Sequence, residues 1–343
     1  MRAVILPGNK EVHVVDRRKP APKEGEVLIR MRVSAICRSD MSLYNGTPIV
    51  GGDAAKTGHI VPGHEPAGDV VEVGAGVKGL KPGDRVAVYL AIGCGHCSYC
   101  LRGYMHLCPQ WKCVGFDVDG GDADYMVAPA ACCLKLPDEM SYETGALLTD
   151  NVGTQYHTQK TLGVSGQDSM AVFGLGPMGS AAVLVAKARG ARVIAVDVLD
   201  SRLHMAKALG VDAVVNSTQQ DAVQALRDWT YGEGVDVAID CSGSPIAQNA
   251  ALDAARKLGS VAFVGESRST TINPSDQMIR KLLRVVGGWH FPVWEWEEIA
   301  RFVIDQNIPV NQYITHRFSI EQAAEAFRMF DERVTDKAVF VWE

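Results

Sequence analysis

The stretch Val172-Phe173-Gly174-Leu175-Gly176-Pro177-Met178-Gly179 decides the fold class of this chain. Its spacing is G-x-G-x-x-G, and it continues the apolar run 169–173, which is typical of a buried strand. Gly174 permits a tight turn, Gly176 lets the backbone approach a pyrophosphate, and Gly179 lets the next helix pack closely on the strand. The N–H groups at the start of that helix face the phosphates. The pattern therefore predicts a dinucleotide site formed by Gly174, Leu175, Gly176, Pro177, Met178 and Gly179.

An acidic residue further along favours this interpretation over an ordinary glycine turn. The next apolar run, 192–196, is followed by Asp197, about 20 residues after the glycines, where a carboxylate can accept hydrogen bonds from the adenosine ribose. The same charge repels the 2′-phosphate of NADP, so the sequence favours NAD. Arg202 is a further cofactor-binding candidate, although its place on the next predicted helix favours a side chain that faces solvent.

Strand and helix patterns alternate around this motif from about Met140 onward. Apolar runs predict strands at 169–173, 192–196, 213–215, 235–239, 260–264 and 283–287. Helical periodicity predicts helices at 178–189, 201–209, 219–230, 246–257 and 275–282. Six strands that alternate with helices form a parallel, doubly wound sheet with right-handed crossovers. The expected fold class is therefore α/β, with a Rossmann-type doubly wound parallel sheet.

The first part of the chain has a different composition and a different hydrophobic pattern. Up to about residue 145 it is rich in glycine, proline and short alternating apolar runs such as 26–33, which predict a β-rich, barrel-like domain. After Trp289, an aromatic segment precedes helices at 295–305 and 320–331 and a strand at 338–342. We therefore expect a β-rich domain at 1–145, a nucleotide-binding domain at 146–288, and a return of 289–343 to the first domain.

Composition argues against several kinds of partner. The 343 residues carry a formal net charge of -6, whereas nucleic-acid binding requires a basic face. No stretch has the ~18 consecutive apolar residues of a membrane span, and residues 1–10 lack the apolar core of a signal peptide. We expect a cytoplasmic protein that binds neither nucleic acid nor membrane.

Four of the nine cysteines fall within the loop 94–108, at Cys94, Cys97, Cys100 and Cys108. In a reducing compartment such a cluster indicates a metal site before disulfides. Four thiolates on a short loop match the closed, tetrahedral ligand set of structural zinc. An iron–sulfur cluster is the competing interpretation, but hydride chemistry with NAD needs no such cluster. His96 and His106 lie inside the loop and are predicted to be surface residues rather than ligands.

A second group of candidate ligands is spread along the chain. It comprises Cys37-Arg38-Ser39-Asp40, Gly63-His64-Glu65 and Asp150. Taken singly, each has an ordinary structural interpretation: a buried cysteine, a hydrogen-bonded loop histidine and a helix cap. Together with the four-cysteine loop and the glycine turn, in this order, they resemble the zinc-dependent alcohol and polyol dehydrogenases of the medium-chain dehydrogenase/reductase family. The resemblance covers essentially the whole chain and implies a GroES-like catalytic domain beside the Rossmann domain.

The resemblance implies the ligands of a catalytic zinc. Cys37, His64 and Asp150 look like three ligands, and Glu65 looks like either an alternative ligand or a carboxylate close to the metal. Asp40 resembles the acceptor that orients a ligating imidazole. The choice between Glu65 and Asp150 as the third ligand stays open at this point.

The resemblance also assigns roles around the zinc. Ser39 looks like the hydroxyl that hydrogen-bonds the substrate oxygen, so the expected catalytic set is Cys37, Ser39, His64 and Asp150. Arg38 resembles an arginine placed on the cofactor pyrophosphate, and Lys337 is a second candidate for that work. Several relatives end a proton relay on a histidine where this chain has Ser42, so here water or the cofactor ribose hydroxyls must carry the proton. His59 is predicted to lie on the surface.

The expected chemistry is hydride transfer between an alcohol and NAD, with zinc as a Lewis acid on the substrate oxygen. The acidic third ligand and the compact length resemble the polyol and secondary-alcohol branches, so we expect a polyol, sugar-like or other secondary alcohol that yields a ketone. A simple aliphatic alcohol is the alternative within the class. A non-catalytic or zinc-free, quinone-reductase-like NAD(P) binder is the alternative outside it, and the ligand set argues against that class. We expect two zinc ions per chain, NAD, and a homodimer or homotetramer.

Aromatic side chains and one histidine are candidates for the rim of the substrate pocket. The run 289–296 is as well explained as core at a domain junction. The candidates are Tyr44, Trp111, Phe116, Trp289, His290, Phe291, Trp294 and Trp296.

Overall fold

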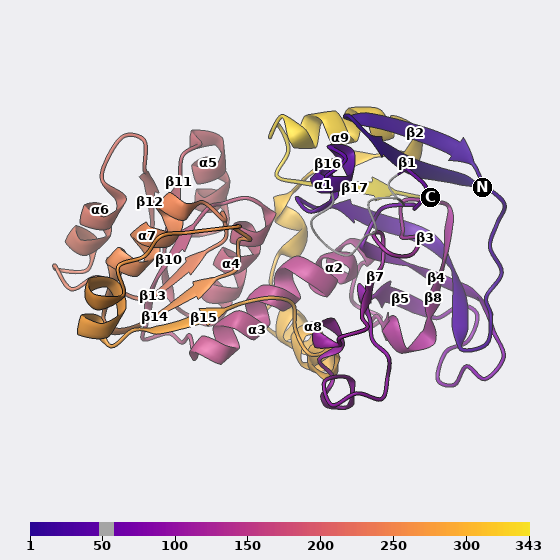
Figure 1. The fold of residues 1–343 in the computed structure, drawn as a ribbon, viewed down its shortest axis with the longest axis horizontal. Coiled ribbons are helices and arrows are strands. Elements are labelled where there is room, and N and C mark those ends of the chain that lie inside the picture. Colours follow the sequence, from indigo (N-terminus) through magenta and orange to yellow (C-terminus); the bar gives the residue numbers. More distant parts are fainter. Residues whose placement is uncertain (48–57) are drawn as a thin grey trace. The chain divides into compact units, whose positions relative to one another are not determined.

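The computed structural model describes residues 1–47 and 58–343 (Figure 1). The chain divides into two compact units. The first unit comprises Met1–Asp150, Pro292–Asp305 and Ile314–Glu343, and the second comprises Asn151–Phe291 and Gln306–Tyr313. The chain therefore enters the second unit directly after Asp150, one of the candidate ligands. Within the described residues, no helix combines the length and the apolar content that a membrane crossing requires.

A six-stranded parallel sheet forms the centre of the second unit. Its order is β12-β11-β10-β13-β14-β15, so the chain starts in the middle and winds outwards on both sides. The strands are β10 (Ser169–Phe173), β11 (Arg192–Asp197), β12 (Ala213–Asn216), β13 (Val235–Asp240), β14 (Ala255–Phe263) and β15 (Arg284–Gly287). This is the doubly wound order, and the expected α/β fold class is confirmed. The glycine turn follows β10, where the strand order reverses and such sheets bind their ligands.

Helices connect the strands of this sheet in the order that the sequence patterns predict. They are α4 (Pro177–Ala188), α5 (Asp200–Ala208), α6 (Ala222–Trp229) and α7 (Pro245–Ala254). The predicted helix at 246–257 ends early because Ala255 is already extended and the chain continues into β14. The predicted helix at 275–282 forms instead a π-helical turn, Pro274–Met278, followed by a 3-10 turn, Ile279–Lys281.

The sequence patterns miss one helix of the second unit, α3 (Gly153–Leu162). Its buried positions include the polar residues Thr154, Gln155, Thr158 and Gln159. Apolar periodicity detects a helix only when the buried face is apolar, so α3 leaves no such signal.

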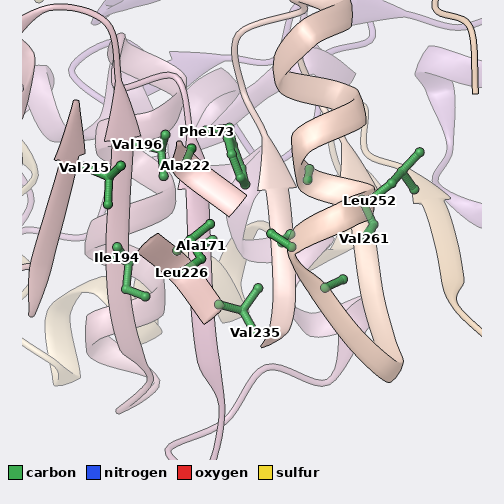
Figure 2. Packing of buried hydrophobic residues seen from close by; sticks show 14 residues of the cluster. Ala171, Phe173, Ile194, Val196, Val215, Ala222, Leu226, Val235, Leu252 and Val261 are labelled. Atoms are coloured by element: carbon green, nitrogen blue, oxygen red, sulfur yellow. The ribbon is translucent and has the colours of Figure 1, made fainter. Parts of the chain in front are cut away.

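The core of the second unit holds in place the edge of the sheet that carries the glycine turn. Figure 2 shows Ala171 and Phe173 of β10 and Val196 of β11 packed with Leu226 of α6. Fully burying a Val, Leu, Ile or Phe side chain stabilises the fold by roughly 1.5–3 kcal/mol relative to exposure. Because these side chains come from the strands that precede the glycine turn and include Asp197, the core fixes the positions of both.

A seven-stranded sheet organises the first unit. Its path is β16-β17-β3-β4-β5-β9, and β8 pairs with β3. The strands are β3 (Glu26–Ile36), β4 (Glu65–Val73), β5 (Arg85–Val88), β8 (Tyr125–Pro129), β9 (Cys133–Lys135), β16 (Ile314–Phe318) and β17 (Lys337–Val341). Two smaller ladders join β1 (Arg2–Gly8) to β2 (Glu11–Asp16) and β6 (Ala91–Ile92) to β7 (Lys112–Cys113). Strand β17 lies between β16 and β3, so residues from the end of the sequence complete a sheet begun near its start.

Short helices accompany this sheet. They are α1 (Asp40–Tyr44), α2 (Tyr142–Leu147), α8 (Trp296–Asp305) and α9 (Ala323–Asp331). Ser141 caps α2 by accepting a hydrogen bond from the backbone N–H of Thr144. Helix α2 runs directly into a π-helical turn, η5 (Leu148–Val152), which carries Asp150. Such turns re-aim side chains and are frequent at functional sites.

Candidate metal centres and nucleotide site

Three elements of the first unit bring the dispersed candidate ligands together. Cys37 follows the end of β3, His64 directly precedes β4, and Asp150 lies in η5. Strands β3 and β4 are antiparallel partners, with Ala35 opposite Glu65, so the segments that carry Cys37 and His64 meet at one end of the ladder.

The ligand atoms of Cys37, His64, Glu65 and Asp150 all lie within 4.8 Å of one another. Cys37 Sγ is 3.5 Å and His64 Nε2 is 3.6 Å from Asp150 Oδ2. A thiolate, an imidazole and carboxylates are the ligand types that zinc prefers. Within the described residues, the buried Oε2 of Glu65 has no hydrogen-bond partner, which is costly for a carboxylate oxygen unless a cation faces it. This donor set fits a zinc ion.

Asp40 holds two of these side chains in position. Its Oδ1 lies 3.0 Å from His64 Nδ1, and its Oδ2 accepts a hydrogen bond of 2.8 Å from the backbone N–H of Cys37. Asp40 is fully buried. Because a carboxylate acceptor keeps the proton on Nδ1, the lone pair of His64 Nε2 is free to bind a metal.

The electrostatics of the cluster also fit a cation. Burial and the nearby Asp150 raise the pKa of the Cys37 thiol, and burial raises the pKa of Glu65 to about 8. Burial lowers the pKa of His64, but Asp40 and Asp150 outweigh this effect and the pKa ends well above its usual value. A divalent cation reverses these shifts, since it favours the thiolate, the carboxylate and the neutral imidazole.

Lys337 belongs to this cluster and not to a pyrophosphate site, which corrects the expectation from the sequence. Its Nζ donates a hydrogen bond of 2.5 Å to Glu65 Oε1, and both side chains are fully buried. Strand β17 pairs with β3, which places Lys337 at the end of the sheet where the candidate ligands meet. A basic residue so far along the chain gave no sequence signal for this pairing.

The neighbours of Cys37 take different positions. Ser39 Oγ lies 3.4 Å from His64 Nε2, beside the candidate metal position. Ser42 Oγ donates a hydrogen bond of 2.7 Å to the backbone carbonyl of Ser39. Arg38 is exposed. His59 is also exposed, as the sequence predicted.

The four cysteines of the loop 94–108 form the second metal-binding group. Their sulfur atoms lie within 4.8 Å of one another. The backbone N–H groups of Cys97 and Cys100 point at the sulfurs of Cys94 and Cys97, at 3.3 and 3.5 Å. Hydrogen bonds from the backbone N–H groups of His96 and Cys97 lower the pKa of Cys94 to about 6. These hydrogen bonds favour the thiolate of Cys94, whereas burial raises the pKa of Cys100. The convergence of four sulfur atoms on one point matches the ligand set of a closed zinc site.

The two histidines of this loop differ. His96 is exposed, as predicted. His106 is buried, which corrects the expectation of a surface residue, and its Nδ1 lies 2.8 Å from the hydroxyl of the fully buried Tyr89. The 3-10 turn Met105–Leu107 directs this side chain inward, and the cysteine spacing alone does not reveal that turn.

The glycine turn of the second unit has the geometry that the sequence predicts. Gly174 has φ +85°, and a Cβ there would lie 2.6 Å from Ser242 Cβ. A Cβ on Gly179 would collide with the carbonyl oxygen of Gly174. Helix α4 begins at Pro177, whose ring occupies a position where no N–H is needed. The remaining free N–H groups at this helix start can face phosphates.

Asp197 and Arg202 close the turn on one side. Asp197 Oδ2 accepts a hydrogen bond of 2.6 Å from the N–H of Leu175, and Oδ1 accepts bonds from Val198 and Leu199. Arg202 Nη1 lies 3.8 Å from Asp197 Oδ2, and its guanidinium is next to Gly176. The expectation that Arg202 faces solvent is therefore wrong, since the carboxylate attracts it over the glycine turn.

The aromatic candidates separate into distinct groups. The ring of Phe116 lies 5.4 Å from the ring of His64 and so borders the candidate site. Tyr44 is buried and stacks on Phe327. In the run 289–296, His290, Phe291 and Trp296 are buried, whereas Trp289 and Trp294 are exposed. Much of this run is therefore core.

Comparison with known proteins now places the chain. Residues 23–138 match the alcohol dehydrogenase GroES-like domain, and residues 177–305 match the zinc-binding dehydrogenase family. The chain is 38% identical over 346 residues to an uncharacterized zinc-type alcohol dehydrogenase-like protein of Escherichia coli strain K12, covering 99% of this chain and 98% of that protein. It is 36% identical over 335 residues to the L-threonine 3-dehydrogenase of Pyrococcus horikoshii, covering 96% and 94%. The solved structure of 2R,3R-butanediol dehydrogenase from Bacillus subtilis is similar with a TM-score of 0.88 and 27% identity, covering 100% and 99%.

A GroES-like unit joined to a zinc-binding dehydrogenase unit defines an alcohol dehydrogenase, an oxidoreductase that acts on the CH–OH group of its donor. The chain belongs to the medium-chain dehydrogenase/reductase family, in its zinc-dependent alcohol and polyol dehydrogenase branch. The family, the enzyme class, the GroES-like domain and the use of zinc that the sequence predicts are thereby confirmed.

Proposed function

We propose that this protein transfers a hydride between a secondary alcohol of polyol or sugar-like type and NAD, giving the ketone. The observation that carries the proposal is the buried convergence of Cys37, His64, Glu65 and Asp150 within 4.8 Å. The Glu65 oxygen without a hydrogen-bond partner and the anionic donors fit a zinc ion, which would stabilise negative charge on an alcohol oxygen at this position.

The proposed mechanism divides the work between cofactors and side chains. Cys37, His64 and Asp150 would hold the zinc, which would supply a Lewis acid for negative charge on the alcohol oxygen. The glycine turn would hold NAD, which would supply the hydride acceptor. Ser39 Oγ, 3.4 Å from His64 Nε2, accepts the alcohol proton. The hydroxyl of Ser42, which donates to the backbone carbonyl of Ser39, does not take up a proton near neutral pH as an imidazole does, so Ser39 passes the proton to water or to a ribose hydroxyl.

Asp197 supports NAD over NADP as the cofactor of this dehydrogenase. Its carboxylate lies beside the glycine turn at the end of β11, where the adenosine ribose of a bound dinucleotide sits. A 2′-phosphate there would meet this negative charge. Arg202 Nη1 lies 3.8 Å from Asp197 Oδ2, so the guanidinium pairs with this carboxylate at the same place. We assign the ribose contact to Asp197 and Arg202 together.

The relatives support a secondary alcohol as the substrate. The names L-threonine 3-dehydrogenase and 2R,3R-butanediol dehydrogenase both describe a secondary hydroxyl next to a carbon with a polar group. The proposed substrate of this chain shares that pattern. A simple aliphatic alcohol is the second candidate within the class. A zinc-free, quinone-reductase-like function has no support, because such proteins lack the ligand set present here.

The test is a substrate screen of the zinc-loaded protein with NAD. The panel contains polyols, sugars, 2,3-butanediol, L-threonine, ethanol and 2-propanol, and NADH formation is followed by absorbance. His64→Ala should abolish turnover and remove one zinc ion per chain, whereas the exposed control His96→Ala should change neither. A preference for ethanol would replace the proposed substrate class. Full activity of His64→Ala would contradict the proposed site.

The homodimer or homotetramer stays a prediction. Sedimentation equilibrium of the zinc-loaded protein measures the assembled mass directly. A mass of two or four chains supports this prediction, and a mass of one chain contradicts it.

A further inference from the structure

One loop of the first unit, residues 114–124 between β7 and β8, packs behind the turn that carries His64; we call it the clamp loop. Its backbone is joined to that turn by three hydrogen bonds. The N–H groups of Gly120, Gly121 and Asp122 donate to the carbonyl oxygens of Val61, Gly63 and Pro62, at 2.8, 2.8 and 3.0 Å. Phe116 of the same loop lies against the His64 ring. The clamp loop therefore contacts both the backbone and the imidazole of this candidate ligand.

The clamp loop buries a carboxyl group at this contact. Asp122 is 1% exposed, and its Oδ1 accepts a hydrogen bond of 2.5 Å from Ser34 Oγ in β3. Within the described residues no lysine or arginine pairs with Asp122. Burial, with the negative charge of Asp40 nearby, raises its pKa to about 7. Burying a carboxyl group without a cationic partner raises the free energy of the folded state. An apolar side chain at this place would be more favourable for stability alone.

The hydrogen-bonded side chains of Ser34 and Asp122 pack directly against Gly63, the residue before His64. Gly63 has φ +94°, and a Cβ there would lie 2.6 Å from Ser34 Oγ and would collide with Asp122 Oδ1. A Cβ on Gly115 would lie 3.0 Å from Gly63 N. Because no free space separates these groups, a shift of the Ser34–Asp122 pair must shift the Gly63 backbone, and with it the direction of the His64 side chain.

We infer that Ser34 and Asp122 are positioning residues for the zinc ligand His64. Asp40 fixes the rotation of the imidazole through Nδ1, and the Ser34–Asp122 hydrogen bond fixes the backbone from which the imidazole projects. Together they aim His64 Nε2 at the point that Cys37 and Asp150 share. This inference rests on the proposed function, since it takes His64 as a metal ligand.

The test measures metal binding as well as turnover, with cobalt(II) replacing zinc as the probe. Ser34→Ala and Asp122→Ala should lose metal from the Cys37 site to a mild chelator about tenfold faster than the wild type, as expected when support of a ligand is removed. The visible d–d spectrum of cobalt should also change, and kcat should fall more than KM rises. Asp122→Asn keeps an acceptor for Ser34 and should restore the wild-type rate of metal loss.

A matched control separates positioning from general stability. Ser169 Oγ donates a hydrogen bond of 2.6 Å to Asp236 in the second unit, so Ser169→Ala removes the same chemistry away from the ligands. Metal loss and cobalt spectra like the wild type in both alanine variants, with a drop in Tm like that of Ser169→Ala, would overturn the inference. If Asp122→Ala does not fold, Ser34→Ala and Asp122→Asn decide it. Retention of cobalt by His64→Ala would instead contradict the proposed function itself.

Discussion

The carboxylate of Asp197 has two tasks in the nucleotide site. It accepts backbone hydrogen bonds from Leu175, Val198 and Leu199, and it lies 3.8 Å from Arg202. The bond to Leu175 fixes the glycine turn itself, so the group that we propose as the ribose acceptor also shapes the proposed phosphate site. A substitution here must affect cofactor choice and turn geometry together.

Asp197→Ser should weaken NAD use and improve NADP use. The change removes a charge-assisted acceptor for the ribose and a repulsive charge for the 2′-phosphate, and it frees Arg202 to pair with that phosphate. Effects that total roughly 3 kcal/mol would move the preference by about a hundredfold. The measurement is kcat/KM with each cofactor for both proteins. The control is Asp200→Ser, which removes a nearby carboxylate that accepts a hydrogen bond from Asn216. This variant should keep the cofactor preference of the wild type. A wild type that already prefers NADP would defeat the prediction.

The sequence predicted the roles of residues in local motifs with fixed spacing better than the positions of side chains that depend on tertiary contacts. Cys94 to Cys108 and the glycine turn are local, so spacing alone implies their geometry. Lys337, His106 and Arg202 depend on which way a side chain points after folding. Lys337 is drawn to Glu65, and Arg202 to Asp197, by charges that approach only in the folded chain. No local pattern contains that information.

Helix α2 brings the chain to the π-helical turn that carries Asp150, and Asp69 of β4 ties the start of α2 to the sheet. The hydroxyl of Tyr142 donates to Asp69 Oδ1, while Arg30 and Arg32 of β3 pair with Oδ2 at 3.0 and 2.8 Å. Burial raises the pKa of Asp69, but the hydrogen bonds from Tyr142, Arg32 and Arg30 outweigh it, and the pKa ends below its usual value.

Asp69→Asn should therefore destabilise the protein in a pH-dependent way. At neutral pH the free energy of unfolding should fall by about 1 kcal/mol, since the hydrogen bonds lose their charge assistance. Because the folded-state pKa is lowered, this contribution exists above the unfolded pKa of about 4 and is lost as the pH falls through the folded pKa. Urea unfolding from about pH 7 to pH 3 should show the two proteins converging in acid. A gap that stays constant over this range would refute the assignment.

Element boundaries show where sequence patterns stop being informative. Strand β10 matches its predicted bounds, because the apolar run 170–173 ends directly at a glycine turn and has few alternatives. Helix α7 ends before its predicted limit, where Lys281 Nζ donates to the carbonyl oxygens of Leu252, Asp253 and Ala255. That cap comes from a residue far along the chain, so periodicity alone places the helix end too late. Helix α3 escapes prediction because its buried positions are polar.

The two metal-binding groups of the first unit should behave differently in the whole molecule. The four-cysteine loop is closed by its own thiolates, and metal binding there is coupled to folding. Wild-type protein should contain two zinc ions per chain. A mild chelator should remove the ion at Cys37, His64 and Asp150 first, abolishing activity while the fold persists.

Cys97→Ser should reduce the zinc content to one ion per chain and lower Tm by about 5 °C or more. The folded fraction should keep its turnover, because the catalytic ligands are untouched. Metal analysis, thermal unfolding and activity of the same sample give the three readings. Cys133→Ser, a thiol outside both metal-binding groups, is the control and should keep both ions. Normal Tm with lost turnover in Cys97→Ser would reverse the assignment of this loop.

The position of β17 between β3 and β16 bears on the order in which the two units can fold during synthesis. Residues 169–287 leave the ribosome as one segment and contain every strand of the second unit's sheet, so that unit can fold while translation continues. The first unit must wait for residues 337–341, which supply both a missing inner strand and the ammonium group that faces Glu65. We therefore expect a nascent chain stalled before Lys337 to carry a folded second unit but an unfinished metal centre.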